Sequence, residues 1–305
     1  MTAKIPLIID CDPGIDDAAA LAVCLFSEQL DVRLITTVAG NVSVDKTYLN
    51  ARKLCHFWGK ETPVSRGAET PLLIPFVPST VHGVSGLNGW EYPEPPQSQE
   101  QPEHAVLSMA RVLRESEQKV SILAMGPLTN LALLFRLYPE LKAKIACLSI
   151  MGGSRSRGNK GIMSEFNIAT DPEAAKIVFE SGIPFALADL EIGYEAALDP
   201  SFCRAMREQN KTGELLYKLF SAYLDGSIQD EVFIFDPTAA AWLLRPDLFE
   251  SLLCRVDVDC GGASPGQTLV DLQGVSGKEP NCHFLTHIDA EGYKSFLLDA
   301  LKACP

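Results

Sequence analysis

The sequence predicts an α/β fold with a mainly parallel central sheet flanked by helices. Short apolar runs of strand character alternate with helix-like runs through the first half of the chain. Such alternation implies right-handed crossovers and a sheet that is covered on both faces. Because no linker, repeat or low-complexity segment divides the 305 residues, we expect a single domain over 1–305 with a C-terminal extension packed on the main sheet.

The individual elements follow from the spacing of apolar residues and from helix punctuation. Strands are expected at 5–10, 32–38, 120–124, 145–150 and 184–188, and helices at 16–26, 43–58, 128–137 and 172–181. The C-terminal third predicts helices near 199–225 and 236–244, strands at 253–258, 268–272 and 283–288, and a last helix. Asp171 is expected to cap a helix that has Pro172 at its first position, and Gly182 follows its last turn.

Two stretches do not fit regular structure. Residues 66–103 are rich in proline, glycine and polar residues, and His82 lies there among several glycines. A loop of this length in a compact domain is commonly a lid or a binding loop. The second stretch, 152–161, is rich in glycine, serine and arginine. In open α/β sheets functional groups collect at the carboxyl ends of the strands, so the residues that follow each strand are the first candidates for a site.

Composition restricts the partners and the compartment. The net charge is −13, which argues against nucleic acid or an anionic membrane as a standing partner. No signal-peptide pattern begins the chain and no apolar run is long enough to span a membrane. The nine cysteines include no CxxC pair, which indicates reduced core residues rather than a zinc or redox motif. We therefore expect a cytoplasmic protein.

The most informative segment is Asp10-Cys11-Asp12-Pro13-Gly14-Ile15-Asp16-Asp17, which places four carboxylates directly after an apolar strand. Like charges this close repel one another unless a cation binds among them. A hard cation with oxygen ligands, calcium or magnesium, is the expected guest. A carboxylate beside such a cation can also activate water, so hydrolysis is the first mechanistic hypothesis. The alternative is a solvated turn whose acids cap the next helix.

The same segment, continued to Ala18, resembles the N-terminal signature of the inosine/uridine-preferring nucleoside hydrolases, although that family usually has Thr in place of Cys11. Further blocks keep the family's order: 38–41 (Val-Ala-Gly-Asn), 126–130 (Gly-Pro-Leu-Thr-Asn), 151–153, 157–159, 165–167 and 171–175. Each block is weak alone, but the ordered set is specific. Val81-His82-Gly83 with Ser85-Gly86 resembles in particular the bacterial ribonucleoside hydrolases of broad specificity.

The resemblance implies cleavage of the N-glycosidic bond between ribose and a purine or pyrimidine base, with Ca²⁺ as cofactor, in nucleoside salvage. It implies that Asp12 contacts the calcium and is the general base for the attacking water. Asp17 would bind the metal through both oxygens, Thr129 through its backbone carbonyl, and Asp236 from far along the chain. Asp10 would support the cluster. These are all oxygen ligands, as calcium prefers.

For the sugar, the resemblance implies that the ribose hydroxyls are bound by five polar residues and that one apolar residue packs against the ring. The polar residues are Asp16, Asn41, Asn159, Glu165 and Asn167, and the apolar residue is Met151. Carboxylates and amides suit a sugar diol, which offers donors and acceptors together. Taken by themselves, the three asparagines are more typical of turns and caps.

One position departs from the family. Members of this branch often carry His-Asp in the C-terminal segment, where the His helps the base to leave, but this chain has Phe235 before Asp236. Phenylalanine cannot donate a proton and can only stack on the base and exclude water. Two interpretations stay open. Either His82 protonates the base when its loop closes, with a solvent-exposed loop histidine as the alternative, or no acid acts.

Three functions are therefore compared. The first is an active ribonucleoside hydrolase, and the second is a ribose- or nucleoside-binding protein that has lost catalysis, for which Phe235 is the support. A phosphatase of the haloacid dehalogenase type comes third, because Gly14 breaks its motif. Tyr223, Asp230 and Glu231 are weaker candidates near the base. The family resemblance implies a homodimer or homotetramer.

Overall fold

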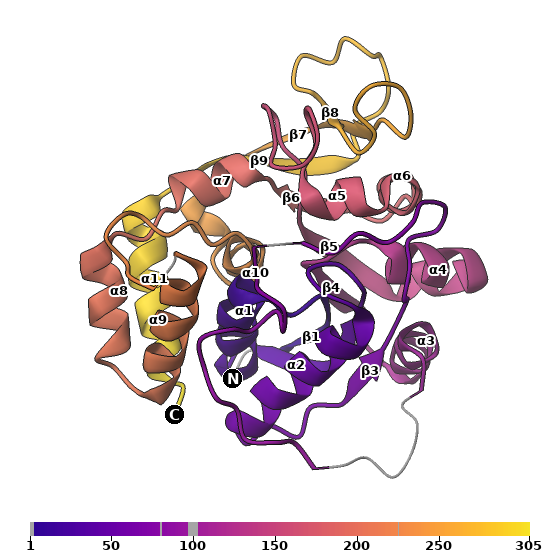
Figure 1. The fold of residues 1–305 in the computed structure, drawn as a ribbon. Coiled ribbons are helices and arrows are strands. Elements are labelled where there is room, and N and C mark those ends of the chain that lie inside the picture. The colour runs from indigo at the N-terminus through magenta and orange to yellow at the C-terminus, as the bar shows by residue number, and fades with distance from the viewer. Residues whose placement is uncertain (1–2, 80, 97–102, 225) are drawn as a thin grey trace.

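The computed structural model describes residues 3–79, 81–96, 103–224 and 226–305 (Figure 1). Within these residues nine strands form one sheet in the order β3-β2-β1-β4-β5-β6-β9-β7-β8. The strands from β3 to β9 in that order pair in parallel, and β7 runs antiparallel to β9 and β8. The predicted α/β fold with a mainly parallel sheet is confirmed.

The elements have the following bounds. The strands are β1 (Ile5–Cys11), β2 (Leu30–Thr37), β3 (Val64–Arg66), β4 (Val120–Ala124), β5 (Ile145–Met151), β6 (Phe185–Ala188), β7 (Phe249–Val258), β8 (Thr268–Asp271) and β9 (Cys282–Ile288). The helices are α1 (Ile15–Phe26), α2 (Val44–Phe57), α3 (Ala105–Glu115), α4 (Thr129–Leu137), α5 (Phe166–Thr170), α6 (Pro172–Phe179), α7 (Leu190–Glu195), α8 (Pro200–Arg207), α9 (Lys211–Tyr223), α10 (Asp236–Leu244) and α11 (Ala290–Lys302). Two short 3₁₀ turns, Pro139–Lys144 and Pro246–Leu248, complete the set.

The central strand β1 shows why helices cover both faces of the sheet. Its side chains alternate, so that Leu7 and Ile9 belong to one hydrophobic core and Ile8 to the other. Helices α1, α2, α9, α10 and α11 contribute to the first core, and α3, α4 and α6 contribute to the second. Because both faces of the strand are covered, it is apolar without interruption until its carboxyl end, as parallel strands usually are.

Several expectations need correction. The region expected as one helix near 199–225 is two helices, because the chain turns after α8 and Asn210 caps α9 by accepting a hydrogen bond from the N–H of Gly213. The C-terminal extension does not pack on the sheet but joins it, since β9 pairs with β6. Four elements were not expected: the short β3, α5 and α7, and the helix α3, which has 11 residues. Beyond Arg66, the last residue of β3, residues 66–103 contain no helix or strand in their described part, as expected, and 80 and 97–102 lie outside it.

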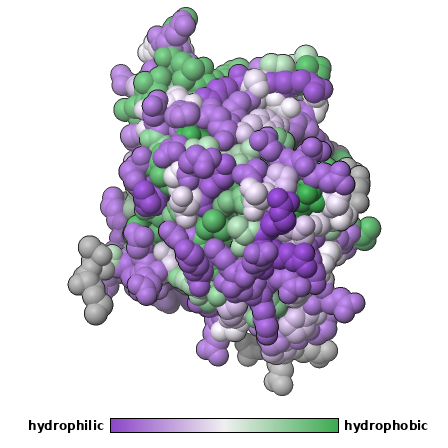
Figure 2. All heavy atoms as spheres, turned by 90° about the vertical axis from the view of Figure 1, so that its left-hand side faces the viewer, coloured by the Kyte–Doolittle hydropathy of each residue, from purple (hydrophilic) through white to green (hydrophobic). Residues whose placement is uncertain are grey.

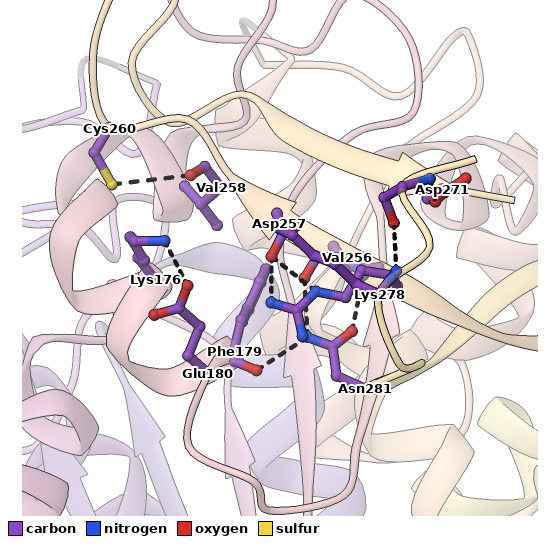
Figure 3. A network of polar contacts seen from close by, with 12 residues as sticks. Lys176, Phe179, Glu180, Val256, Asp257, Val258, Cys260, Asp271, Lys278 and Asn281 are labelled. Atoms are coloured by element: carbon purple, nitrogen blue, oxygen red, sulfur yellow. Dashed lines mark hydrogen bonds and ion pairs between the residues drawn. The ribbon is translucent and has the colours of Figure 1, made fainter. Parts of the chain in front are cut away.

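The far edge of the sheet, at β7 and β8, is held by polar contacts (Figure 3). Asp257 pairs with both Arg255 and Lys278, while Asn281 donates to the carbonyls of Phe179 and Val256. These contacts fasten the extension to α6. The face that carries α8 and α9 is predominantly hydrophilic, with apolar side chains scattered over it (Figure 2). No helix in the described ranges has the length and apolar character needed to cross a bilayer.

The topology brings the candidate residues to one edge of the sheet. The strand order reverses between β1 and β4, because the chain moves outward through β2 and β3 and then returns to the other side of β1. Crevices at such a switch point are where open α/β sheets bind ligands. The residues that follow β1, β2, β4 and β5 therefore meet at this carboxyl edge.

A helix cap gives a first testable prediction. Asp171 caps α6 at the N–H of Ala174 (3.1 Å) and also accepts from the Thr129 hydroxyl (2.6 Å) and the Leu72 N–H (2.9 Å). Asp171→Ala would leave two buried donors and one half-buried donor without a partner, so we expect the free energy of unfolding in urea to fall by about 3 kcal/mol.

The matched control is Asp289, which caps α11 at the N–H of Gly292 on an exposed part of the surface. Asp289→Ala is expected to cost only about 1 kcal/mol. Equal losses in the two variants would contradict the view that Asp171 links α4, α6 and the 66–79 loop.

Candidate active site

A cluster of carboxylates lies at the carboxyl end of β1. Asp12 follows that strand, Asp16 and Asp17 lie in the first turn of α1, and Asp236 begins α10. Asp12, Asp17 and Asp236 are buried, and oxygen atoms of Asp16, Asp17 and Asp236 lie within 4.8 Å of one another. The packing of α1 against α10 thus brings Asp236 beside acids that are more than 200 positions away in the sequence.

Burial governs the electrostatics of this cluster. It raises the pKa of Asp17 to about 7, with the charge of Asp16 as the next cause, and it raises the pKa values of Asp12 and Asp236 well above the usual range. Neighbouring carboxylates add to each shift. A cation placed among these groups would reverse both effects, because it would replace lost hydration and offset the mutual repulsion.

Two oxygens in the cluster show that the site fits a hard cation. Asp12 Oδ1 and Asp17 Oδ1 are buried and have no hydrogen-bond partner among the described residues. The other oxygen of each group is satisfied, since Asp12 Oδ2 accepts from the N–H of Asn41 (2.6 Å) and Asp17 Oδ2 from the N–H of Gly14 (2.8 Å). Buried carboxylate oxygens without a donor are costly, and an all-oxygen donor set suits Ca²⁺ or Mg²⁺.

Asp12 is enclosed by backbone that comes from two neighbouring loops. A Cβ atom at Gly40 would overlap Asp12 Oδ2, and a Cβ atom at Gly126 would lie 2.8 Å from Asp12 Oδ1. Only glycine lets the chain approach the carboxylate this closely. The loops after β2 and β4 therefore fix the position of Asp12, which gives a physical reason for the glycines of the sequence blocks at 38–41 and 126–130.

Asp10 lies behind the cluster and is held by hydrogen bonds. Its Oδ1 accepts from the Thr36 hydroxyl (2.6 Å) and from Asn130 Nδ2 (2.8 Å), and burial raises its pKa to about 7. Asn130 was not singled out from the sequence, although its amide also bonds the Thr37 carbonyl and the Ala68 N–H. It is fully buried and links β1, β2 and the 66–79 loop.

Thr129, the first residue of α4, is buried beside Asn130. Its hydroxyl donates to Asp171 Oδ2 (2.6 Å). The side chain is thus engaged in the scaffold, and only the backbone carbonyl is left for a metal. That metal contact stays a prediction.

A cavity of about 370 Å³ opens next to the acid cluster. All the residues expected to bind the substrate line it: Asp16, Asn41, Met151, Asn159, Glu165, Asn167 and Phe235. His82 and Asp236 line it as well, whereas Asp12, Asp17 and Thr129 do not. The structure therefore brings together residues from β5, α1, α5, α10 and four separate loops around one space that has a polar end near the acids.

The polar end is fixed by backbone contacts. Glu165 caps α5 with Oε1 on the N–H of Asn167 (2.8 Å) and Oε2 on the N–H groups of Ile168 (3.1 Å) and Gly153 (3.0 Å). Asn167 Nδ2 donates to the carbonyls of Met125 (3.0 Å) and Met151 (3.3 Å). Burial raises the pKa of Glu165 to about 7. Capping and cavity lining thus coincide in the same side chains.

His82, for which a solvent-exposed loop histidine was the alternative, is half-buried and lines the cavity wall. Its Nδ1 accepts a hydrogen bond from the N–H of Ile15 (3.2 Å), which leaves the ring proton on Nε2. Burial lowers its pKa, and the charge of Asp16 opposes that shift. Tyr223 lies near it, with ring centroids 6.1 Å apart, and lines the same cavity. Asp230 and Glu231 are exposed and do not line the cavity.

The other end of the cavity is aromatic and aliphatic. Phe235 packs edge-to-face against Tyr194, with ring centroids 5.5 Å apart, and Phe233 contacts the same tyrosine at 5.3 Å. Phe233, Phe220 and Val77 line the cavity but were not expected from the sequence. In the sequence, apolar residues that line a cavity cannot be distinguished from the apolar residues of the two hydrophobic cores.

Comparison with known proteins extends over the whole chain. It is 43% identical to proteins named non-specific ribonucleoside hydrolase RihC from Salmonella heidelberg and Salmonella newport, with 100% of both chains covered. A solved inosine-guanosine nucleoside hydrolase superposes with a TM-score of 0.92 at 31% identity, covering 98% of this chain and 99% of that chain. A plant nucleoside hydrolase, PpNRh1, has a TM-score of 0.90 at 29% identity, covering 99% and 100%.

With the acid cluster and the cavity beside it, these likenesses define an enzyme of the nucleoside hydrolase class. More specifically, the chain belongs to the inosine-uridine preferring nucleoside hydrolase family, whose model matches residues 7–295. The resemblance drawn from the sequence blocks is confirmed, and the phosphatase hypothesis is wrong. The nine cysteines are free, as expected.

The unpartnered oxygens lead to a prediction about metal. Adding Ca²⁺ or Mg²⁺ to metal-free protein is expected to raise its Tm, because a cation bound only by the folded state stabilises it by about 2.7 kcal/mol at a hundred times its Kd. Asp17→Asn removes one negative charge from the cluster, so calorimetry should show a much smaller rise.

The matched control is Asp299→Asn, which removes one charge from an exposed position of α11 and should keep the full rise. A rise that is equal in wild type and Asp17→Asn would mean that the cation binds elsewhere.

Proposed function

We propose that this protein hydrolyses the N-glycosidic bond of ribonucleosides and releases ribose and the free base. The observation that carries the proposal is the pair of buried, unpartnered oxygens, Asp12 Oδ1 and Asp17 Oδ1, beside a cavity whose near end holds amides and carboxylates. The relatives named non-specific ribonucleoside hydrolase support a broad choice of base.

The proposed cofactor is Ca²⁺, held by Asp12, Asp17, Asp236 and the backbone carbonyl of Thr129. The donor set supports calcium because all these ligands are oxygens and several are anionic. When bound, the cation supplies positive charge that makes a nearby water easier to deprotonate.

In the proposed reaction Asp12 accepts the proton of the attacking water. The bond from the water oxygen to ribose C1′ forms as the bond from C1′ to the base nitrogen breaks, and the base leaves with that electron pair. Positive charge develops on the ribose ring in such a transition state. The carboxylates of Asp16 and Glu165 near the ring would stabilise it, and Asn41, Asn159 and Asn167 would hold the hydroxyls while Met151 packs on the ring.

The departing base needs a proton from the protein or from solvent. His82 is the proposed donor, because it lines the cavity and Phe235 has no proton to give. To act as an acid it must gain a proton on Nδ1, which breaks the hydrogen bond from the Ile15 N–H. A shift of the 81–86 turn would therefore accompany proton donation.

A second candidate function is a ribose- or nucleoside-binding protein of the same fold with impaired catalysis. The observation that favours it is Phe235 at the position where the family often has histidine. The two candidates differ in whether ribose is released from bound nucleoside.

We further propose that the protein acts in cytoplasmic nucleoside salvage as a homodimer or homotetramer.

The general base gives a prediction for turnover. Asp12→Asn keeps the shape of the side chain but removes its basicity, so ribose release from inosine and uridine in the presence of Ca²⁺ should fall at least about a hundredfold. Asp299→Asn is the charge-matched control and should keep full activity. If Asp12→Asn matched the wild type, Asp12 would not be the base, and if no wild-type release occurred although nucleosides bound, the binding-protein hypothesis would replace the hydrolase.

The leaving-group step gives a second prediction. His82→Ala should lower kcat for inosine by about a hundredfold, because a purine base leaves poorly without a proton. It should change kcat for nitrophenyl riboside little, because nitrophenolate leaves unprotonated. Steady-state kinetics with both substrates measure the ratio, and an equal loss for the two substrates would argue against an acid role.

A further inference from the structure

The place of Phe235 depends on a glycine in another helix. A Cβ atom at Gly193 in α7 would overlap Cδ1 of Phe235 and would lie 2.9 Å from Cε1 and 3.2 Å from Cγ. The phenyl ring therefore occupies the space that any other side chain at 193 would begin to fill. Tyr194, the next residue of α7, packs edge-to-face on the same ring with an interplanar angle of 86°. Helix α7 thus forms a seat for this ring.

The backbone of Phe235 cannot easily move to relieve a clash. Its carbonyl accepts from the Thr238 hydroxyl (2.6 Å) and the Thr238 N–H (3.0 Å), and its N–H points to Asp16 Oδ2 (3.4 Å). The next residue, Asp236, is buried in the acid cluster. A larger residue at 193 would therefore turn the ring into the cavity rather than shift the chain.

The wall around this seat is apolar. Leu190, Val232, Phe233, Ile234 and Phe235 line the cavity on the side of α7 and the segment before α10. Among the described residues of the lining, the polar side chains outside the acid cluster come from other segments: Asn41, Ser79, His82, Asn159, Lys160, Glu165, Asn167 and Tyr223. On the α7 side the residues that line the cavity thus offer a base no side-chain proton donor, only ring edges and aliphatic groups.

We propose that Gly193 is a specificity-determining residue that acts with Phe235: it seats the phenyl ring beside the cavity and so gives the base subsite an apolar wall without an acid. The enzyme consequently selects ribosides by leaving group, and favours those whose aglycone departs unprotonated or with a proton from the His82 side. This inference rests on the proposed function.

A double-mutant cycle tests the pairing. Gly193→Ala is expected to lower kcat/KM for inosine at least about tenfold when residue 235 is Phe, because the displaced ring enters the cavity. In a Phe235→Ala background the same Gly193→Ala change should cost less than about twofold, since no ring is left to displace. Equal losses in both backgrounds would overturn the proposal, because Gly193 would then act through helix α7 alone.

A second variant tests the missing acid. Phe235→His places an ionisable ring in the same seat, and it should raise kcat/KM for inosine relative to nitrophenyl riboside at least about tenfold, with a pH profile that loses the gain above the imidazole pKa. An unchanged ratio would overturn the claim that the α7 wall sets the leaving-group chemistry. Inhibition by free ribose and the Tm rise with Ca²⁺ should stay the same in all variants, which separates a changed base subsite from a damaged fold.

Failure of this inference can be told apart from failure of the proposed function. Wild-type turnover of inosine, uridine or nitrophenyl riboside tests the function and does not depend on a substitution at residue 193. If the wild type released no ribose, titration calorimetry with inosine on the same four proteins of the cycle would still measure how the contact between residues 193 and 235 affects binding. Weaker binding in Gly193→Ala only when Phe235 is present would support it, and equal weakening in both backgrounds would overturn it.

Discussion

The arrangement of this protein depends on the burial of several carboxylates at the carboxyl end of one central strand. Such a cluster is unfavourable by itself, as the raised pKa values of Asp12, Asp17 and Asp236 show. The surrounding scaffold holds it in place with main-chain donors, such as the N–H of Asn41, with two close glycines and with the amide of Asn130 behind it. The fold thus holds the carboxylates together in a site that a bound hard cation would stabilise.

The cavity next to the cluster combines two chemically different ends. At the polar end Glu165 is fixed by a helix cap and Asn167 by main-chain carbonyls, so their positions do not depend on the substrate. At the other end the wall is built from aromatic edges and aliphatic groups on α7 and before α10. A polar end suits a sugar and an apolar end suits a planar base, so one cavity can hold both halves of a nucleoside.

Long and strongly patterned elements were predictable from the sequence. The buried strands β1 and β4 and the helices α1 and α2 appear within a few residues of their expected bounds, because their apolar periods extend over enough positions to be read. Short elements were not: β3 has three residues and α7 has six, too few to establish a period. The 11-residue helix α3 was also missed, although its length does not explain this. Asn130 was recognised only as part of a sequence block and its role was not predicted, because it bridges three segments that only folding brings together.

The sequence by itself determined the fold class, the family and the set of acidic and amide residues, since these are encoded in local patterns and in ordered motifs. Only the tertiary structure decided that Asp236 lies against Asp16 and Asp17, that His82 turns into the cavity, and that Phe235 rests on Gly193. Each of these contacts joins residues far apart in the chain, and its distance is set by how helices pack on the two faces of the sheet, which no local pattern contains.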